Sequence, residues 1–127
     1  MANNSVHILS PLGKTWIFDL DGTIVKHNGY LIDGKDTLLE GALEFLGGIS
    51  KDDMIVFVTS RKYEYKRVTE DFLDEFGIRY NAIIYEAPFG ERILVNDRKP
   101  SGLDMAISIN VERDVFMEDR FAVDQAL

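Results

Sequence analysis

The ten residues KTWIFDLDGT at positions 14–23 decide how the chain folds. Their apolar centre, Trp16–Phe18, predicts a buried strand because three large apolar side chains are contiguous. Two carboxylates, Asp19 and Asp21, follow this strand at once, and Gly22 permits a tight turn that a Cβ would hinder. The stretch therefore predicts a strand that delivers two carboxylates to one end of a sheet.

Outward from this stretch, short apolar runs alternate with amphipathic ones. The predicted strands are Lys14–Phe18, Met54–Val58, Ala82–Tyr85, Ile93–Val95 and a fifth at Ala106–Ile109. Helical spacing of apolar residues predicts helices over 38–46 and 61–76 and a closing helix within 111–127, whereas 19–35 reads as a loop or small flap. The alternation predicts an α/β fold with a parallel sheet, in which ligands bind at the carboxyl ends of the strands.

The bulk properties of the chain narrow its function. We expect a single domain over residues 1–127. The chain has no cysteine, which excludes disulfides and a thiolate nucleophile, and no apolar run of transmembrane length or signal-peptide pattern, so we expect a cytoplasmic protein without a membrane partner. A net charge of -8 disfavours nucleic acid as a partner, and a phosphate-processing site would need a cation.

Asp19 and Asp21 suit a divalent cation together with a nucleophile and an acid, since Mg²⁺ prefers oxygen ligands. The alternative is a solvated Asp-Gly turn. Thr59 and Ser60 follow the second strand, where a hydroxyl either binds a phosphoryl oxygen or caps the next helix. Arg61 opens that helix, where a cation is electrostatically disfavoured, which favours a role in ligand binding.

A third strand-end carboxylate strengthens this interpretation. Asp97 directly follows the predicted strand that contains Ile93–Val95. Three strands would thus deliver Asp19, Thr59 and Asp97 to one edge of one sheet, as a metal-assisted phosphoryl-transfer site requires.

Three motifs give the chain a resemblance to the haloacid dehalogenase (HAD) superfamily. Asp19-Leu20-Asp21-Gly22-Thr23 resembles its first motif, Val56 to Arg61 resembles its second, and Leu94 to Asp97 resembles its fourth. The resemblance covers residues 15–109 and implies a three-layer, Rossmann-like parallel sheet with helices on both faces.

The same resemblance implies a mechanism. Asp19 would attack phosphorus and form an aspartyl-phosphate, and Asp21 would act as acid and then as base. Mg²⁺ would be held by Asp19, the backbone carbonyl of Asp21, and Asp97. Thr59 would contact the phosphoryl group. The substrate-binding residues implied with it are Gly22, Thr23, Ser60 and Arg61.

In the family, a lysine or arginine neutralises the phosphoryl charge, and here the sequence departs from that pattern. Glu86 stands where short members often have a lysine. Arg92 begins its predicted strand, at the wrong end of the sheet. Lys99, beyond Asp97, therefore takes the role here with help from Arg61, unless Lys99 is part of a solvated turn.

The sequence has no insertion large enough for a cap domain, so the resemblance is to capless members, which often oligomerise. We expect a Mg²⁺-dependent phosphatase, with a phosphorylated sugar as the leading substrate class and a homo-oligomer as a possible assembly. A non-enzymatic or weakly active phosphate- or metal-binding module, and a phosphotransferase, remain as alternatives.

Overall fold

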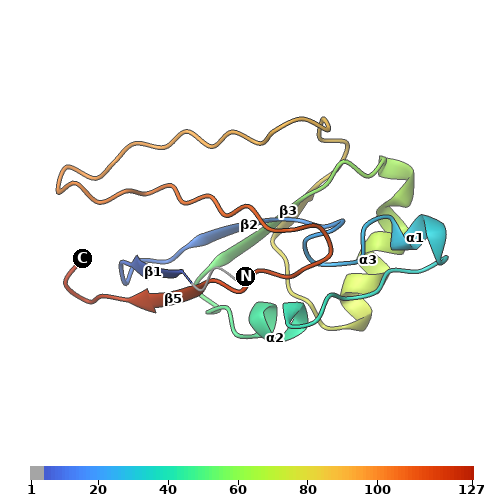
Figure 1. The fold of residues 1–127 in the computed structure, drawn as a ribbon, viewed down its shortest axis with the longest axis horizontal. Helices are drawn as coiled ribbons and strands as arrows, with labels where there is room; N and C mark the ends of the chain where they lie inside the picture. The colour runs from blue at the N-terminus through green and yellow to red at the C-terminus, as the bar shows by residue number, and fades with distance from the viewer. Residues whose placement is uncertain (1–4) are drawn as a thin grey trace. The chain divides into compact units, whose positions relative to one another are not determined.

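The computed structural model describes residues 5–127 (Figure 1). Its strands are β1 (Val6–Leu9), β2 (Thr15–Asp19), β3 (Met54–Val58), β4 (Ala82–Ile84) and β5 (Arg120–Val123). Its helices are α1 (Gly29–Ile32), α2 (Ala42–Gly47) and α3 (Lys66–Glu75), with a 3₁₀ turn, η1 (Tyr63–Tyr65), before α3. Among the described residues, no helix has both the length and the apolar character needed to cross a membrane.

The chain forms two compact units, which we describe separately. The site unit comprises residues 13–88 and 111–117, and the arm unit comprises the described residues 5–12 together with 89–110 and 118–127. The stretch at positions 14–23 that decides the fold belongs entirely to the site unit.

The site unit is built on a three-stranded parallel sheet in the order β2-β3-β4. The α/β class and the first three strands predicted from the sequence are confirmed within a residue or so at each end. In register, Trp16 lies beside Ile55 and Phe18 beside Phe57, so these four side chains share one face of the sheet. Parallel pairing brings the carboxyl ends of β2 and β3 to the same edge, where Asp19 lies beside Val58.

The core packs on one face of this sheet. Phe18, Ile55 and Phe57 form a buried cluster with Leu46 of α2 and Leu73 of α3. Burying side chains of this size contributes about 1.5–3 kcal/mol each, which makes this cluster the main source of stability in the site unit.

The opposite face of the sheet is more open. Ile17, Met54 and Ile84 are 53%, 47% and 52% exposed. The core of the site unit therefore involves one face, and the three-layer arrangement expected from the sequence is not shown.

The arm unit contains the second sheet, in which β1 pairs with β5 in parallel. A hydrogen bond of 2.7 Å between His7 Nε2 and Asp119 Oδ2 supports it, and the His7 ring stacks on Phe121. The closing helix predicted within residues 111–127 is wrong, because this segment holds β5 and no helix. The backbone of β5 forms its hydrogen bonds with β1, a strand that the sequence analysis did not predict.

The segment Phe89–Asn110, which we call the arm, runs out to a turn and back (Figure 1). At the turn, Lys99 N–H donates to Leu103 O at 2.9 Å and Gly102 N–H donates to Lys99 O at 2.8 Å. The strands predicted at Ile93–Val95 and Ala106–Ile109 are wrong for this structure: both segments are neither helix nor strand. A strand requires a hydrogen-bonded neighbour, and no described strand pairs with either segment.

Candidate active site

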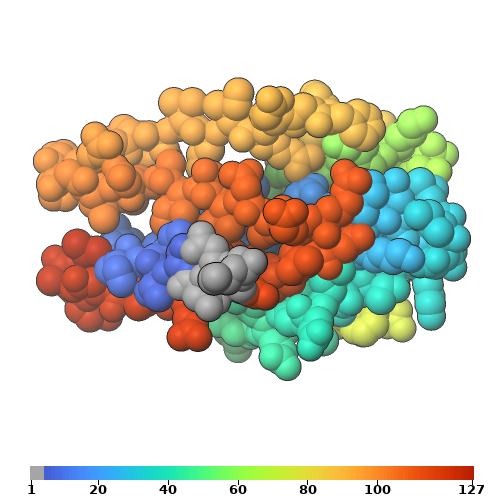
Figure 2. Space-filling model, in the orientation of Figure 1, coloured from blue at the N-terminus to red at the C-terminus, as the bar shows by residue number. Residues whose placement is uncertain are grey.

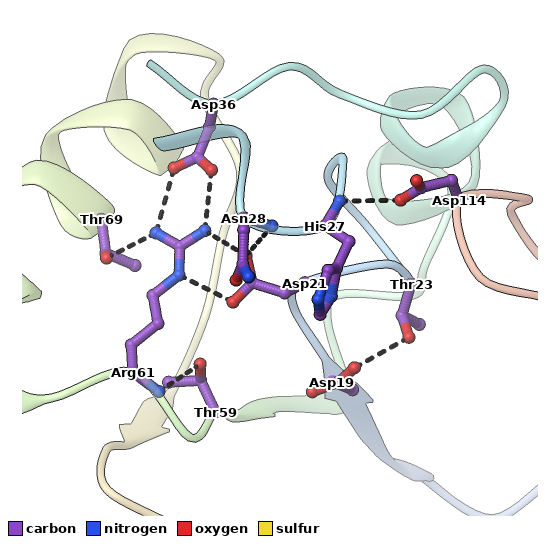
Figure 3. A network of polar contacts seen from close by, with 10 residues as sticks. All are labelled: Asp19, Asp21, Thr23, His27, Asn28, Asp36, Thr59, Arg61, Thr69 and Asp114. Atoms are coloured by element: carbon purple, nitrogen blue, oxygen red, sulfur yellow. Dashed lines mark hydrogen bonds and ion pairs between the residues drawn. The ribbon is translucent and has the colours of Figure 1, made fainter. Parts of the chain in front are cut away.

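Asp19 is the last residue of β2 and lies at the carboxyl edge of the sheet (Figure 3). The hydroxyl of Thr23 donates a hydrogen bond of 3.0 Å to Asp19 Oδ2. This bond fixes the carboxylate relative to the turn that follows the strand. The sequence placed both residues in the site, and the structure brings them together.

The turn after β2 is closed by its own backbone. The carbonyl oxygen of Leu20 accepts from the N–H groups of Thr23, Ile24 and Val25, at 2.9–3.1 Å. Gly22 has a φ of 82°, and a Cβ at this position would approach Arg113 Cγ to 3.1 Å. Both the left-handed backbone and the close approach of that side chain require glycine here.

Arg61 ties the loop that follows β2 to helix α3 (Figure 3). Its Nε and Nη2 both donate to Asp21, each at 3.0 Å. Its Nη1 and Nη2 donate to Asp36 at 3.0 and 2.7 Å, and Nη1 also donates to Thr69 Oγ1 at 2.9 Å. These five contacts match the five N–H groups of a guanidinium. We call Arg61, Asp21, Asp36 and Thr69 the Arg61 cluster.

The Arg61 cluster is buried. The side chains of Arg61, Asp36 and Asp21 are 1%, 2% and 16% exposed. Burial opposes the charge of Arg61, but hydrogen bonds to Asp36 and Asp21 outweigh it and hold the pKa of Arg61 above its ordinary value. The ring of Tyr30 lies 3.9 Å from the guanidinium carbon and covers one of its faces. Arg61 is therefore a permanently charged, fully paired group.

This pairing changes the interpretation of two residues that the sequence assigned to phosphate binding. Each side-chain N–H of Arg61 is directed at a protein oxygen, and these contacts hold the loop that follows β2. Thr59 is 0% exposed, and its Oγ1 accepts the Arg61 backbone N–H at 3.1 Å. That contact closes a turn after β3 and caps no helix, because η1 begins after Lys62 and α3 begins after Tyr65, and neither has a side-chain cap. Ser60 is partly exposed, and its hydroxyl donates to Pro88 O at 3.4 Å.

Glu86, which stands where a lysine was expected, has a structural contact. Its Oε2 accepts the backbone N–H of Tyr63 at 3.3 Å, at the start of η1. Its own N–H donates to Arg61 O at 2.9 Å, and its φ of 61° is left-handed. A carboxylate satisfies a free N–H at a helix start, which a lysine cannot do.

A short segment distant in sequence supports the turn after β2. Asp114 N–H donates to Gly22 O at 2.8 Å, and Asp114 Oδ1 accepts from the His27 backbone N–H at 2.7 Å. The His27 ring also lies beside the turn, since a Cβ on Gly22 would be 3.8 Å from its Nδ1. Sequence reasoning missed Asp114, Asp36 and Thr69, because no local spacing marks contacts that span from 8 to 92 residues.

Asp97 and Lys99 belong to the arm unit, whereas Asp19, Asp21 and Thr59 belong to the site unit. Both residues are exposed, close to the turn at the end of the arm. The part of the chain that the structure describes contains no group of three His, Cys, Asp or Glu residues that could hold a metal ion.

Comparisons with known proteins add no relative. No protein-family model matches the chain, and searches of curated proteins and of solved structures find no match either.

Proposed function

We propose that the protein is a Mg²⁺-dependent phosphomonoester hydrolase in which Asp19 is the nucleophile. The observation that supports this best is the position of Asp19 at the carboxyl end of a parallel strand, held by Thr23 beside the Gly22 turn. Ligands of parallel α/β sheets bind at this edge, and a carboxylate fixed there is suited to attack a bound phosphoryl group.

The reaction has two displacements. One oxygen of Asp19 attacks phosphorus, and the bond from phosphorus to the substrate's ester oxygen breaks, which leaves an aspartyl-phosphate and an alcohol that has gained a proton. Water then attacks phosphorus, releases inorganic phosphate and regenerates the Asp19 carboxylate. The Thr23 hydrogen bond holds one Asp19 oxygen and so orients the other, which limits the freedom lost on reaching the transition state.

Asp21 is the group proposed to give the proton to the leaving oxygen and later to take one from water. Its Oδ1 also accepts the Asn28 backbone N–H at 3.3 Å, in addition to the two bonds from Arg61. Both oxygens are thus engaged. Proton transfer through Asp21 needs one of these bonds to lengthen, so the Arg61 cluster sets how readily Asp21 acts.

The metal proposed here would be held by the Asp19 carboxylate, the Asp21 backbone carbonyl and Asp97. Bound Mg²⁺ offsets the repulsion between an acidic site and a phosphate dianion. Lys99 is proposed to neutralise the same charge. We further propose a capless, HAD-like three-layer arrangement and a phosphorylated sugar as the substrate class, both on the resemblance of the motifs.

Replacing Asp19 with Asn tests the function. Hydrolysis of an aryl phosphate in Mg²⁺ should fall by about 10³-fold or more, since an amide cannot form the phosphoryl intermediate. The matched control is Asp33→Asn, in the same loop, whose carboxylate makes an exposed ion pair with Lys26 at 2.9 Å. Circular dichroism should show both variants folded. Wild-type activity in Asp19→Asn would refute the mechanism.

One observation favours a second candidate, a phosphate- or metal-binding module without turnover. The engagement of both Asp21 oxygens with Arg61 removes the free acid that efficient hydrolysis needs. Calorimetry that detects Mg²⁺ binding, together with no product from sugar phosphates, nucleotides or phosphopeptides, would favour this module over the hydrolase.

A further inference from the structure

Asp36 is a buried carboxylate that takes no direct part in the proposed reaction. Its side chain is 2% exposed, and its Oδ1 and Oδ2 accept from Arg61 Nη2 and Nη1 at 2.7 and 3.0 Å. Burying a carboxylate costs desolvation free energy, and apolar residues that pack well are often as good for stability as a buried ion pair. The stability of the fold alone therefore does not account for an aspartate at this position.

Arg61 lies between two carboxylates (Figure 3). Its Nε and Nη2 donate to Asp21, and its Nη2 and Nη1 donate to Asp36, so each carboxylate takes one edge of the guanidinium. Thr69 Oγ1 also accepts from Nη1, at 2.9 Å. Because a guanidinium is planar and its donors form a rigid fork, holding one edge fixes the direction of the other. Asp36 and Thr69 therefore determine the direction in which Arg61 donates to Asp21.

The segment that carries Asp36 is itself held by backbone pairing. Lys26 N–H donates to Thr37 O at 2.9 Å, and Val25 and Leu38 form an antiparallel bridge. These contacts join the segment to the residues that follow the turn after β2, within the site unit. Backbone that is paired in this way opens less readily than a solvated loop, so Asp36 provides a fixed anchor for Arg61.

The two carboxylate oxygens of Asp21 are held to different extents. Oδ1 accepts from Arg61 Nη2 at 3.0 Å and from the Asn28 backbone N–H at 3.3 Å. Within residues 5–127, the one donor to Oδ2 is Arg61 Nε, at 3.0 Å. Oδ2 is therefore the oxygen better suited to exchange a proton, since each carboxylate oxygen can accept two hydrogen bonds. The bond that lengthens during proton transfer is then the one between Arg61 Nε and Oδ2.

We propose that Asp36 is a positioning residue for this proton transfer and that it acts on Asp21 through Arg61. The proposal rests on the hydrolase proposed above. In the first displacement, the bond from phosphorus to the ester oxygen breaks as Asp19 bonds to phosphorus, and the proton passes from Asp21 Oδ2 to the leaving oxygen. While the bond from Arg61 Nε lengthens, Asp36 retains the opposite edge of the guanidinium. Without Asp36 the guanidinium would follow Asp21, and a displacement of about 1 Å can cost about 10²-fold in rate.

The dependence of the rate on the leaving group tests this role. Asp36→Asn should lower kcat/KM for glycerol phosphate, whose alcohol takes up a proton as it leaves, by about 10–100-fold. For dinitrophenyl phosphate, whose phenolate leaves without a proton, kcat/KM should change by less than about twofold. Thr69→Val removes one acceptor of Arg61 Nη1 and should give a smaller loss with the same selectivity, which provides a second test should Asp36→Asn not fold.

The matched control is Asp53→Asn, which alters a structural carboxylate away from the proposed chemistry. Asp53 directly precedes β3, at the amino end of that strand. Its Oδ1 accepts the Lys14 backbone N–H at 2.9 Å, and its Oδ2 accepts from Trp16 Nε1 at 3.0 Å. This variant should lower stability as well, but it should change kcat/KM for the two substrates by the same factor. The comparison separates a positioning role from a merely structural one.

Equal losses for the two substrates in Asp36→Asn, or no loss for either in the folded variant, would overturn the proposal. Hydrogen exchange provides a readout without turnover, because the Asn28 N–H donates to Asp21 Oδ1. Its exchange should be about tenfold faster in Asp36→Asn and unchanged in Asp53→Asn. Unchanged exchange in Asp36→Asn would overturn the positioning role. A wild type without turnover would refute the hydrolase alone, so the two failures are separable.

Discussion

The Arg61 cluster and the arm differ in how completely their groups are satisfied. In the Arg61 cluster, five N–H groups meet five acceptors, and the arginine side chain is 1% exposed. In the arm, apolar side chains such as Val95 at 88% are directed to solvent. The space-filling view shows the arm, in orange, as part of the molecular surface (Figure 2). One region is satisfied by contacts within the chain, and the other leaves large apolar side chains exposed.

This difference in burial and pairing indicates how each region contributes to the stability of the fold. A buried charge network depends on all its members being present, because a missing partner leaves another charge unpaired in a poorly solvated place. An exposed apolar segment gains little from its own chain and gains on association. Substitutions in the first region should therefore lower the stability of the fold far more than substitutions in the second.

The largest effect is expected from Arg61→Met. The change leaves the Asp21 and Asp36 carboxylates without their counter-charge, which costs on the order of 3–5 kcal/mol in the free energy of unfolding. Urea denaturation followed by circular dichroism measures it. The matched control is Arg67→Met on α3, whose side chain is 94% exposed in a 3.8 Å ion pair with Asp71, and whose midpoint should not move. Equal effects for the two variants would contradict the role assigned to the Arg61 cluster.

How well the sequence predicts these two regions depends on how far apart in the sequence the contacting residues lie. The strand Thr15–Asp19 and the Gly22 turn were predictable, because consecutive residues carry the signals for a buried strand and for a tight turn. The Arg61 cluster was not, since the pairing of Arg61 with Asp36 joins residues 25 apart that no periodicity links. Apolar composition predicted a strand at Ile93–Val95, but composition cannot supply the hydrogen-bonded neighbour that makes a strand.

Two leucine substitutions, one in each region, test the comparison, and the larger of their two effects on stability should be of intermediate size. Leu73→Ala removes a core side chain that is 1% exposed, so we expect a loss of about 2–5 kcal/mol at every protein concentration. Leu94→Ala, in the arm, removes a side chain that is 55% exposed. Its effect should stay within about 0.5 kcal/mol, because truncating an exposed side chain leaves no buried cavity. Thermal unfolding measures both, and equal losses in the two variants would contradict the difference assigned to the two regions.

The smallest effect is expected from Asp104→Asn, which breaks the 2.6 Å ion pair between Arg98 Nε and Asp104 Oδ1 close to the turn of the arm. The two side chains are 66% and 70% exposed, so water solvates each charge almost as well as its partner does. The melting temperature should stay within measurement error, at low and at moderate salt. The instructive contrast is Asp36→Asn, which alters an ion pair to Arg61 of 2.7 Å whose members are 1% and 2% exposed and should lower the melting temperature clearly. Two ion pairs of similar length thus differ in their effect on the melting temperature, because burial and not distance decides how much an ion pair contributes to stability.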